Sequence, residues 1–204
     1  LDNLIMYTDA SYHTIDDEDG MVISRECLGS VHVFDQANRK HYTAYGRLPD
    51  EYYRHFPTLE QYIGRGELGF GVAALFSMPL LFKNRKVIHF IDNIQALSNM
   101  VNGYSGKPDM ARLVNMFHLA LIALNCEWYG EWCPSKANIG DIMTRPERFH
   151  ELLEGLAKLP EEMFSELINC EIKLAPLDES WTDLKAWMRE MRKRADGQRS
   201  GDEE

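Results

Sequence analysis

The sequence predicts a mixed α/β fold, and two observations lead to this prediction. The first third of the chain consists of short apolar runs separated by polar turns, as in consecutive antiparallel strands. The remainder alternates stretches of helical period with short apolar runs, as in proteins that cover a sheet with helices. The expected order is three strands, a helix, a strand, two helices, a strand and a helix.

The three expected strands at the start form an antiparallel meander. Residues 4–11 are the first strand, and the acidic stretch "HTIDDEDG" is a polar turn. The alternating stretch "MVISRECLGSVHVFDQ" is the second strand, and "QANRK" is the next turn. The third strand, "HYTAYGRLP", ends at Pro49. Short connections of this kind favour neighbouring antiparallel strands.

The later elements complete the predicted five-stranded mixed sheet and the helices that flank it. A buried helix begins at about Glu67, and its Gly69 and Gly71 each cost roughly 1 kcal/mol of helix propensity, so we expect close packing against the sheet. Strands follow in "NRKVIHFID" and "CEWYGEWCP". Between these strands lie two helices, "NIQALSNMVNG", with Gly103 as C-cap, and "DMARLVNMFHLALIALN". The segment "SKANIGDIMTRPERFHELLEGLAKL" leads through a loop into a further helix.

A change of pattern near Pro160 divides the chain into a main domain, residues 1–150, and a C-terminal helical extension with an acidic tail, residues 151–204. The extension ends in a helix, "WTDLKAWMREMRK", with an apolar face. Two interpretations of this face stay open: the helix packs onto the main body, or it docks onto a partner.

Composition limits the function classes. A net charge of −10 over 204 residues argues against a protein that holds nucleic acid by bulk positive charge. The four cysteines form neither a C-x-x-C pair nor a disulfide framework, so we expect a reducing intracellular compartment, cytoplasmic or nuclear. We find no apolar run long enough for a membrane span and no signal peptide. Because the chain begins with Leu, we expect that it is processed or excised from a longer protein.

Four acidic residues lie at the edges of apolar elements: Asp9, Glu67, Asp92 and Asp141. Each alone has a simple structural explanation, as a helix cap, a first-turn acid or a turn residue. Four carboxylates on elements that can meet, however, cannot all stay ionised without counter-charge. Mg²⁺ and Mn²⁺ are the ions that suit carboxylate and water ligands. The joint pattern therefore favours a metal site.

Four motifs carry a more specific signal. "YTDAS", "GELGFGVAAL", "FIDNIQAL" and "WCPSKANIGDIMTR" occur in this order over roughly residues 4–150. In order and context they resemble the ribonuclease H domain of retroelement, retrotransposon-type, reverse transcriptases. "TDAS" alone is weak, whereas the four together on the expected elements are strong. The resemblance implies a ribonuclease H-like fold with three antiparallel strands first.

The resemblance also implies an activity: hydrolysis of the RNA strand of an RNA–DNA hybrid with two Mg²⁺ or Mn²⁺ ions about 4 Å apart. Asp9 would bridge the ions, Glu67 and Asp92 would hold one of them on the attacking side, and Asp141 would hold the other. Side chains beside the acids are candidates for contact with the nucleic-acid backbone or the 2′-OH. These candidates are Ser11, Asn93, Ser135, Asn138 and Arg145.

The sequence departs from the ribonuclease H pattern in two respects, and other functions therefore stay open. The loop "CPSKANIG" has no histidine, whereas cellular and retroviral members often carry one there that helps product release; retrotransposon-type members lack it. The acidic charge predicts weak substrate affinity, so we expect an adjoining polymerase domain or a larger complex. A catalytically idle module captured as a structural or binding subunit is the main alternative, and a related nuclease chemistry on the same fold is another. We interpret His89 as a packed strand residue rather than a catalytic one.

Overall fold

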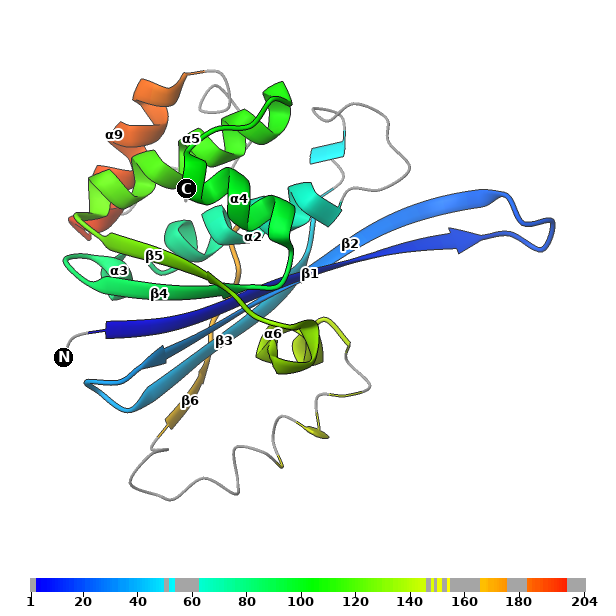
Figure 1. Ribbon diagram of the computed structural model, residues 1–204, viewed down its shortest axis with the longest axis horizontal. Coiled ribbons are helices and arrows are strands. Elements are labelled where there is room, and N and C mark those ends of the chain that lie inside the picture. The colour runs from blue at the N-terminus through cyan, green and yellow to red at the C-terminus, as the bar shows by residue number, and fades with distance from the viewer. Residues whose placement is uncertain are drawn as a thin grey trace, which may run out of the picture.

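A six-stranded mixed sheet with the order β5-β4-β1-β2-β3-β6 is the centre of the fold (Figure 1). The computed structural model describes residues 3–49, 52–53, 63–145, 148, 150–151, 154, 166–175 and 183–197. The strands are β1 (Asn3–Asp16), β2 (Val22–Asp35), β3 (Lys40–Arg47), β4 (Lys86–Ile91), β5 (Glu127–Trp132) and β6 (Glu166–Asn169). The helices are α2 (Ile63–Ser77), α3 (Pro79–Phe82), α4 (Ile94–Asn102), α5 (Pro108–Leu124), α6 (Ile139–Met143) and α9 (Leu184–Ala195), with a short 3₁₀ turn, η1, at Ser135–Ala137.

The predicted fold class is confirmed by the strand pairing. β1 pairs antiparallel with β2, and β2 pairs antiparallel with β3, as expected for the meander. On the other side of β1, β4 and then β5 are added in parallel. The prediction of five strands needs one correction, because β6 from the C-terminal extension pairs in parallel with β3 and makes a sixth. The extension was expected to be helical, and this four-residue strand was not foreseen.

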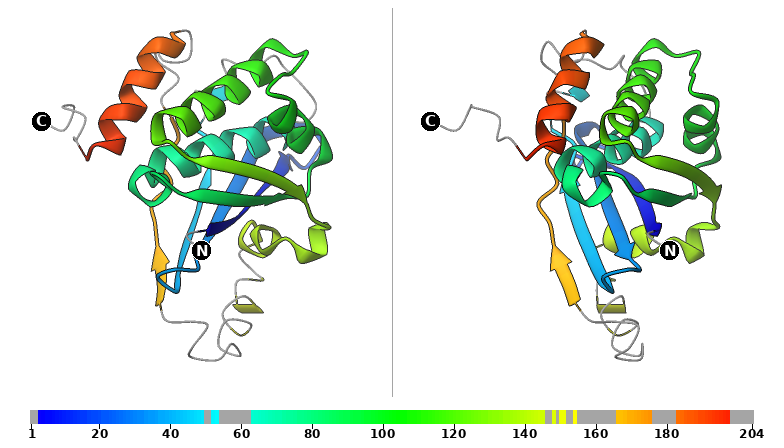
Figure 2. Two further views of the ribbon diagram at one scale, coloured as in Figure 1. Left: turned by 60° about the vertical axis from the view of Figure 1, so that its left-hand side comes forward. Right: turned by 90° about the vertical axis from the view of Figure 1, so that its left-hand side faces the viewer.

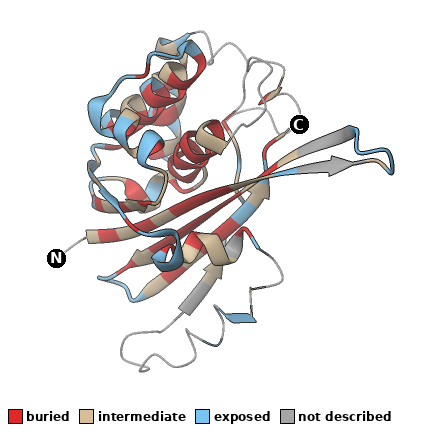
Figure 3. Cartoon of the chain, turned by 45° about the vertical axis from the view of Figure 1, so that its right-hand side comes forward, coloured by how far each residue is buried: buried red, intermediate tan, exposed pale blue. Residues whose placement is uncertain are grey.

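Strands β1 and β2 pair with each other over a longer stretch than either pairs with its other neighbour in the sheet. β4 pairs with β1 only over residues 3–7, and β3 pairs with β2 only from Leu28 to Asp35. The two long strands continue beyond these neighbours as a projecting arm (Figures 1 and 3). The first strand was predicted to stop at residue 11, with a polar turn after it. It continues to Asp16 because the pairing with β2 continues, and the turn follows at residues 17–21.

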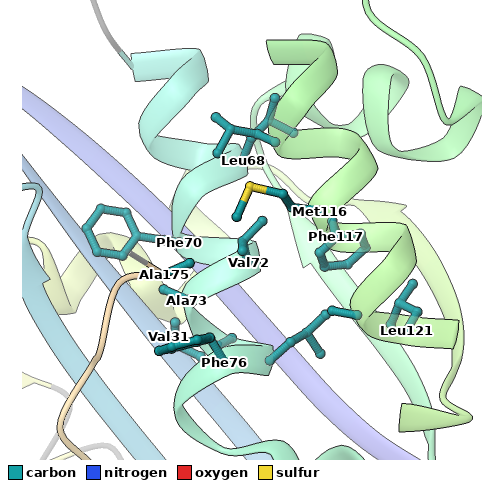
Figure 4. Packing of buried hydrophobic residues seen from close by; sticks show 14 of the residues in the cluster. Val31, Leu68, Phe70, Val72, Ala73, Phe76, Met116, Phe117, Leu121 and Ala175 are labelled. Carbon is teal, nitrogen blue, oxygen red and sulfur yellow. The ribbon is translucent and has the colours of Figure 1, made fainter. Parts of the chain in front are cut away.

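Helices α2, α4 and α5 cover one face of the sheet, and α6 lies against the other (Figure 2). The core lies under α2 and α5, where Leu68 and Val72 pack with Met116 and Phe117 (Figure 4). The close approach of α2 to the sheet depends on Gly66, where a Cβ would lie 2.5 Å from the Cys27 sulfur.

The two glycines expected to allow this approach have other surroundings. A Cβ at Gly71 would meet Met100 of α4 at 2.8 Å, and one at Gly69 would meet only Leu48, at an ordinary 4.0 Å. Gly71 therefore permits close packing between helices, and close packing of α2 on the sheet depends on Gly66 instead. Gly103 takes the left-handed conformation after α4, as its predicted C-cap role requires.

Helix α9 packs onto the main body. Trp187 is buried, its indole N–H donates to the Met116 carbonyl over 2.8 Å, and its ring stacks on Phe76. Met191 is also fully buried. Trp187 and Met191 of the predicted apolar face are therefore part of the core of the main body, whereas Trp181 lies outside the described residues. Among the helices that the structure describes, none combines the length and the apolar character that crossing a bilayer requires.

Candidate metal centre

Strand register brings Asp9 and Asp92 to the same level of the sheet. Tyr7 of β1 is paired with Phe90 of β4, and both chains run in the same direction. Each aspartate lies two residues further along its own chain, just beyond the last paired residues. Parallel strands therefore deliver the two carboxylates side by side at one edge, the usual place for sites in α/β sheets.

Glu67 reaches the same point from the second turn of α2. One carboxylate oxygen from each of Asp9, Glu67 and Asp92 lies within 4.8 Å of the others. No other group of three or more potential ligand residues comes together in this way within the described ranges. Three of the four predicted ligands thus converge on a volume the size of one cation site.

Burial and mutual repulsion perturb Asp9 strongly. The side chain is almost fully buried, and burial is the main cause that raises its pKa to about 7. The negative charges of Asp92 and Asp141 raise the pKa further. Two donors oppose the shift: the Thr144 hydroxyl, 2.7 Å from Asp9 Oδ2, and the backbone N–H of Ala10. Asp9 is therefore held in place, but no cationic group of the described residues lowers its pKa.

Burial and neighbouring negative charges also perturb the pKa of Glu67. Its Oε1 accepts a hydrogen bond from the Ala10 backbone N–H over 3.2 Å. Its Oε2 is buried and has no hydrogen-bond partner among the residues that the structure describes. Burial first, and then the charges of Asp9 and Asp92, raise the pKa of Glu67 well above its ordinary value.

The three carboxylates fit a bound divalent cation. An orphaned carboxylate oxygen inside a protein is costly, and such a group calls for an explanation such as an ion. A hard divalent ion would supply both the missing ligand contact and the missing positive charge. The donor set consists of oxygens alone, as Mg²⁺ and Mn²⁺ prefer.

Helix α6 is fastened tightly to the sheet beside Asp9. Gly140 lies so close that a Cβ there would be 2.8 Å from the Asp9 Cβ. The Ser30 hydroxyl on β2 donates to the Gly140 carbonyl over 2.9 Å, and the Asn138 side-chain amide donates to the Thr8 carbonyl over 3.1 Å. These contacts fix the backbone that carries Asp141.

Asp141 lies at the site but is not one of the three converging carboxylates. Its Oδ1 is 2.9 Å from the guanidinium of Arg145, and its Oδ2 is 3.2 Å from that of Arg148. Its negative charge still adds to the effect of burial and of Asp92 in raising the pKa of Asp9. The predicted quartet is therefore a trio with a neighbouring fourth acid that two arginines neutralise.

An open pocket of about 600 Å³ surrounds the carboxylates. Eight of the nine predicted site residues line it: Asp9, Ser11, Glu67, Asp92, Asn93, Ser135, Asp141 and Arg145. Asn138 does not. Its side chain is buried, donates to Thr8 and accepts from the Gly140 N–H as the cap of α6, so it positions the helix and does not face the pocket.

Three residues of the site were missed by sequence reasoning. Thr144 holds Asp9, Arg148 binds Asp141, and His13 lines the pocket from the projecting arm, with its ring 3.1 Å from the Ser11 hydroxyl. The period-two spacing of Asp9, Ser11 and His13 on one strand was the available signal for His13. Thr144 and Arg148 had no comparable signal, because their roles depend on how α6 packs.

His89 is a packed strand residue, as interpreted. It is fully buried, with one ring nitrogen 2.6 Å from the Thr8 hydroxyl and the other accepting from the Trp128 indole N–H over 3.2 Å. Burial lowers its pKa to about 3, so the ring is neutral. It joins β1, β4 and β5 below the carboxylates and does not line their pocket.

Comparison with known proteins yields distant structural likeness and no match in sequence. No protein-family model matches the chain, and no curated protein matches it. Among solved structures, the chain is similar to the N-terminal RNase H domain of Rv2228c from Mycobacterium tuberculosis, solved as a fusion with maltose-binding protein. The TM-score is 0.46 at 14% identity, over 75% of this chain and 97% of that one. The case for function therefore rests on the geometry of the carboxylate pocket.

Proposed function

We propose that this protein is a metal-dependent endonuclease that hydrolyses the RNA strand of RNA–DNA hybrids, as part or descendant of a retroelement reverse transcriptase. The observation that supports the proposal is the convergence of Asp9, Glu67 and Asp92 with their oxygens within 4.8 Å of one another. The four motifs that contain these residues and Asp141 add the choice of substrate. Three converging carboxylates, two of them buried, that have no counter-charge among the described residues serve no evident packing purpose.

The carboxylates would hold two Mg²⁺ or Mn²⁺ ions, with Asp141 as the fourth ligand. When bound, such ions polarise a phosphoryl oxygen, lower the pKa of a water and stabilise the leaving oxygen. The protein's own contribution is preorganisation. Thr144 fixes the Asp9 carboxylate and the Ala10 N–H fixes that of Glu67, so these two ligands are in place before substrate arrives.

The rim of the pocket supplies polar groups for a nucleic-acid strand. Ser11, Asn93 and Ser135 line it with hydroxyl and amide groups, which can contact phosphate or the 2′-OH that distinguishes RNA from DNA. With a net charge of −10, affinity for the hybrid should be weak and strongly salt-dependent. An adjoining polymerase domain or a larger intracellular complex would then supply the rest of the binding.

A catalytically idle binding module is the second candidate, and one observation favours it. Asp141 is already neutralised by Arg145 and Arg148, so the fourth ligand is engaged elsewhere. An idle module would keep the fold and the pocket but would not respond to metal. The two candidates therefore differ in a measurable property, the change in melting temperature with Mg²⁺ or Mn²⁺.

The proposal is tested by incubating the protein with labelled RNA–DNA hybrid, DNA duplex and RNA duplex of one sequence, with Mn²⁺ or Mg²⁺. Wild type should cut only the RNA strand of the hybrid, and Asp92→Asn should cut nothing. Cutting of DNA duplex instead would point to a related nuclease chemistry. No cutting and no metal-dependent melting shift by a folded protein would favour the idle module.

A further inference from the structure

Two arginines hold the Asp141 carboxylate at the edge of the metal pocket. Arg145 binds one oxygen of Asp141 at 2.9 Å, and Arg148 binds the other at 3.2 Å. Arg148 is held in turn by Glu151, which accepts from its Nε at 3.0 Å and from a terminal nitrogen at 2.8 Å. The remaining face of the Arg148 guanidinium is thus aimed at the position that the Asp141 carboxylate occupies.

The backbone that carries Asp141 is fixed, so only its side chain can change position. The backbone of α6 is fixed by the bonds from Ser30 to Gly140 and from Asn138 to Thr8, and by the Thr144–Asp9 bond. Changing the surroundings of Asp141 therefore requires rotation about side-chain bonds, which needs no shift of the helix. Rotation turns the Asp141 carboxylate away from the arginines within the pocket that it lines together with Asp9, Glu67 and Asp92.

The arginines are accessible to a ligand. The side chain of Arg145 is 51% exposed and lines the pocket, and that of Arg148 is 36% exposed. A guanidinium binds the oxygens of a carboxylate and of a phosphate with the same planar, two-pronged geometry. The Asp141 carboxylate therefore occupies a position between the two arginines that also suits the oxygens of a phosphodiester.

We propose that Arg145 and Arg148 form a binding subsite for one phosphodiester of the nucleic-acid strand, and that its occupation releases Asp141 to join Asp9, Glu67 and Asp92. This inference rests on the proposed function, because it assigns the substrate contact that completes the metal site. The phosphate replaces the Asp141 carboxylate on the arginines. Asp141, once unpaired, turns toward the trio, where a cation supplies the counter-charge it has lost.

Substrate and metal are then coupled. Before substrate binds, the arginines compete with the cation for Asp141, so metal affinity is low. A bound phosphodiester removes that competition and raises metal affinity, and by linkage metal raises the affinity for substrate by the same factor. Hydrolytic metal chemistry is thereby assembled only where a nucleic-acid strand lies in the pocket.

The experiment compares wild type with the double variant Arg145→Gln/Arg148→Gln in two binding assays that need no cleavage. The first measures binding of a labelled hybrid by fluorescence anisotropy in metal-free buffer over a range of salt. The second measures the melting shift with Mn²⁺ alone. Arg189→Gln is the matched control, since Arg189 is an exposed arginine on α9, 3.8 Å from Asp183.

The two assays should change in opposite directions. Without its arginines the protein should bind hybrid about tenfold or more weakly, and its salt slope should fall by roughly one, for the one phosphate that is no longer contacted. The same variant should bind Mn²⁺ more tightly than wild type, because Asp141 is released. Adding Asp141→Asn to the double variant should abolish that gain, and Arg189→Gln should match wild type in both assays.

Other results would overturn the inference. Weaker binding of both hybrid and Mn²⁺ by the double variant would show that the arginines only support the local structure. Unchanged binding of hybrid and of Mn²⁺ would show that the arginines affect neither ligand. If no variant, wild type included, binds Mn²⁺, the proposed function and the release of Asp141 both fail. If wild type binds Mn²⁺ and cuts hybrid while the double variant behaves identically, the inference fails and the proposed function stands.

Discussion

Replacing Asp9 by Asn should stabilise the metal-free protein at pH 8. Asp9 is nearly fully buried, and its pKa is raised from 3.8 to about 7. A difference of roughly three pH units, at about 1.4 kcal/mol for each, corresponds to on the order of 4 kcal/mol of unfavourable free energy when the group is ionised. An Asn side chain avoids the charge and can still accept the Thr144 hydroxyl.

The pH dependence has a definite sign. The folded state binds the Asp9 proton more tightly than the unfolded state, so stability falls as pH rises from about 4 to about 7, and the full cost is present above that. At pH 8 the Asn variant should melt several degrees higher than wild type, because 1 kcal/mol shifts the melting temperature of a chain of this size by about 2–4 °C. Near pH 4 the two should melt together.

Scanning fluorimetry in chelator measures this directly, and titration with Mn²⁺ supplies the second half of the test. Metal should raise the melting temperature of wild type by mass action and leave Asp9→Asn almost unchanged. A variant that is less stable than wild type at pH 8 without metal would refute the reasoning. It would show that Asp9 has favourable partners that balance its burial.

Three further predictions follow from single contacts. Thr144→Val should cost about 1.5–3 kcal/mol in urea unfolding, because it removes a hydrogen bond to an ionisable carboxylate, and it should reduce cleavage; Thr144→Ser should restore both. The imidazole of His89 should stay neutral in NMR titrations down to about pH 3, and titration near its ordinary value of 6.5 would contradict its burial between Thr8 and Trp128. Trp187→Ala should cost about 3–5 kcal/mol by opening a cavity under α9. The folded Trp187→Ala protein should keep its cleavage rate, and a loss of cleavage out of proportion to stability would show that the extension acts on the site.

Much of the carboxylate site follows from the sequence, because its position depends on local pattern. Asp9 and Asp92 both follow the apolar residues that pair β1 with β4, and a parallel register then brings them together. Glu67 lies on an apolar helix, and such a helix is expected to pack on the sheet that carries the two aspartates. The convergence of these three residues follows from the elements that carry them and needs no knowledge of side-chain conformation.

The rest depends on tertiary contacts. The side-chain conformation of Asp141 determines whether its carboxylate faces the metal site or the arginines. One of these arginines, Arg148, lies seven residues further along, in a segment without a clear hydrophobic period. The role of Asn138 as a cap rather than a substrate contact depends on how α6 meets β1. Strand β6 has only four residues, too few for alternation to distinguish a strand from a turn of helix.

The division into residues 1–150 and a separate extension stays a prediction. β6 pairs with β3, and α9 packs on α5. The extension thus shares its sheet and its core with the main domain, and the sequence pattern that changes near Pro160 gave no sign of this.

The central claim is that the acidic pocket hydrolyses RNA in a hybrid, and one measurement tests it most directly. Labelled RNA–DNA hybrid is incubated with Mn²⁺ or Mg²⁺ and either wild type or Asp92→Asn. Cutting of the RNA strand by wild type, and none by the variant, is the predicted result. Equal cutting by both proteins would place the activity outside this pocket. No cutting by a folded wild type that also shows no metal-dependent melting shift would contradict the claim outright.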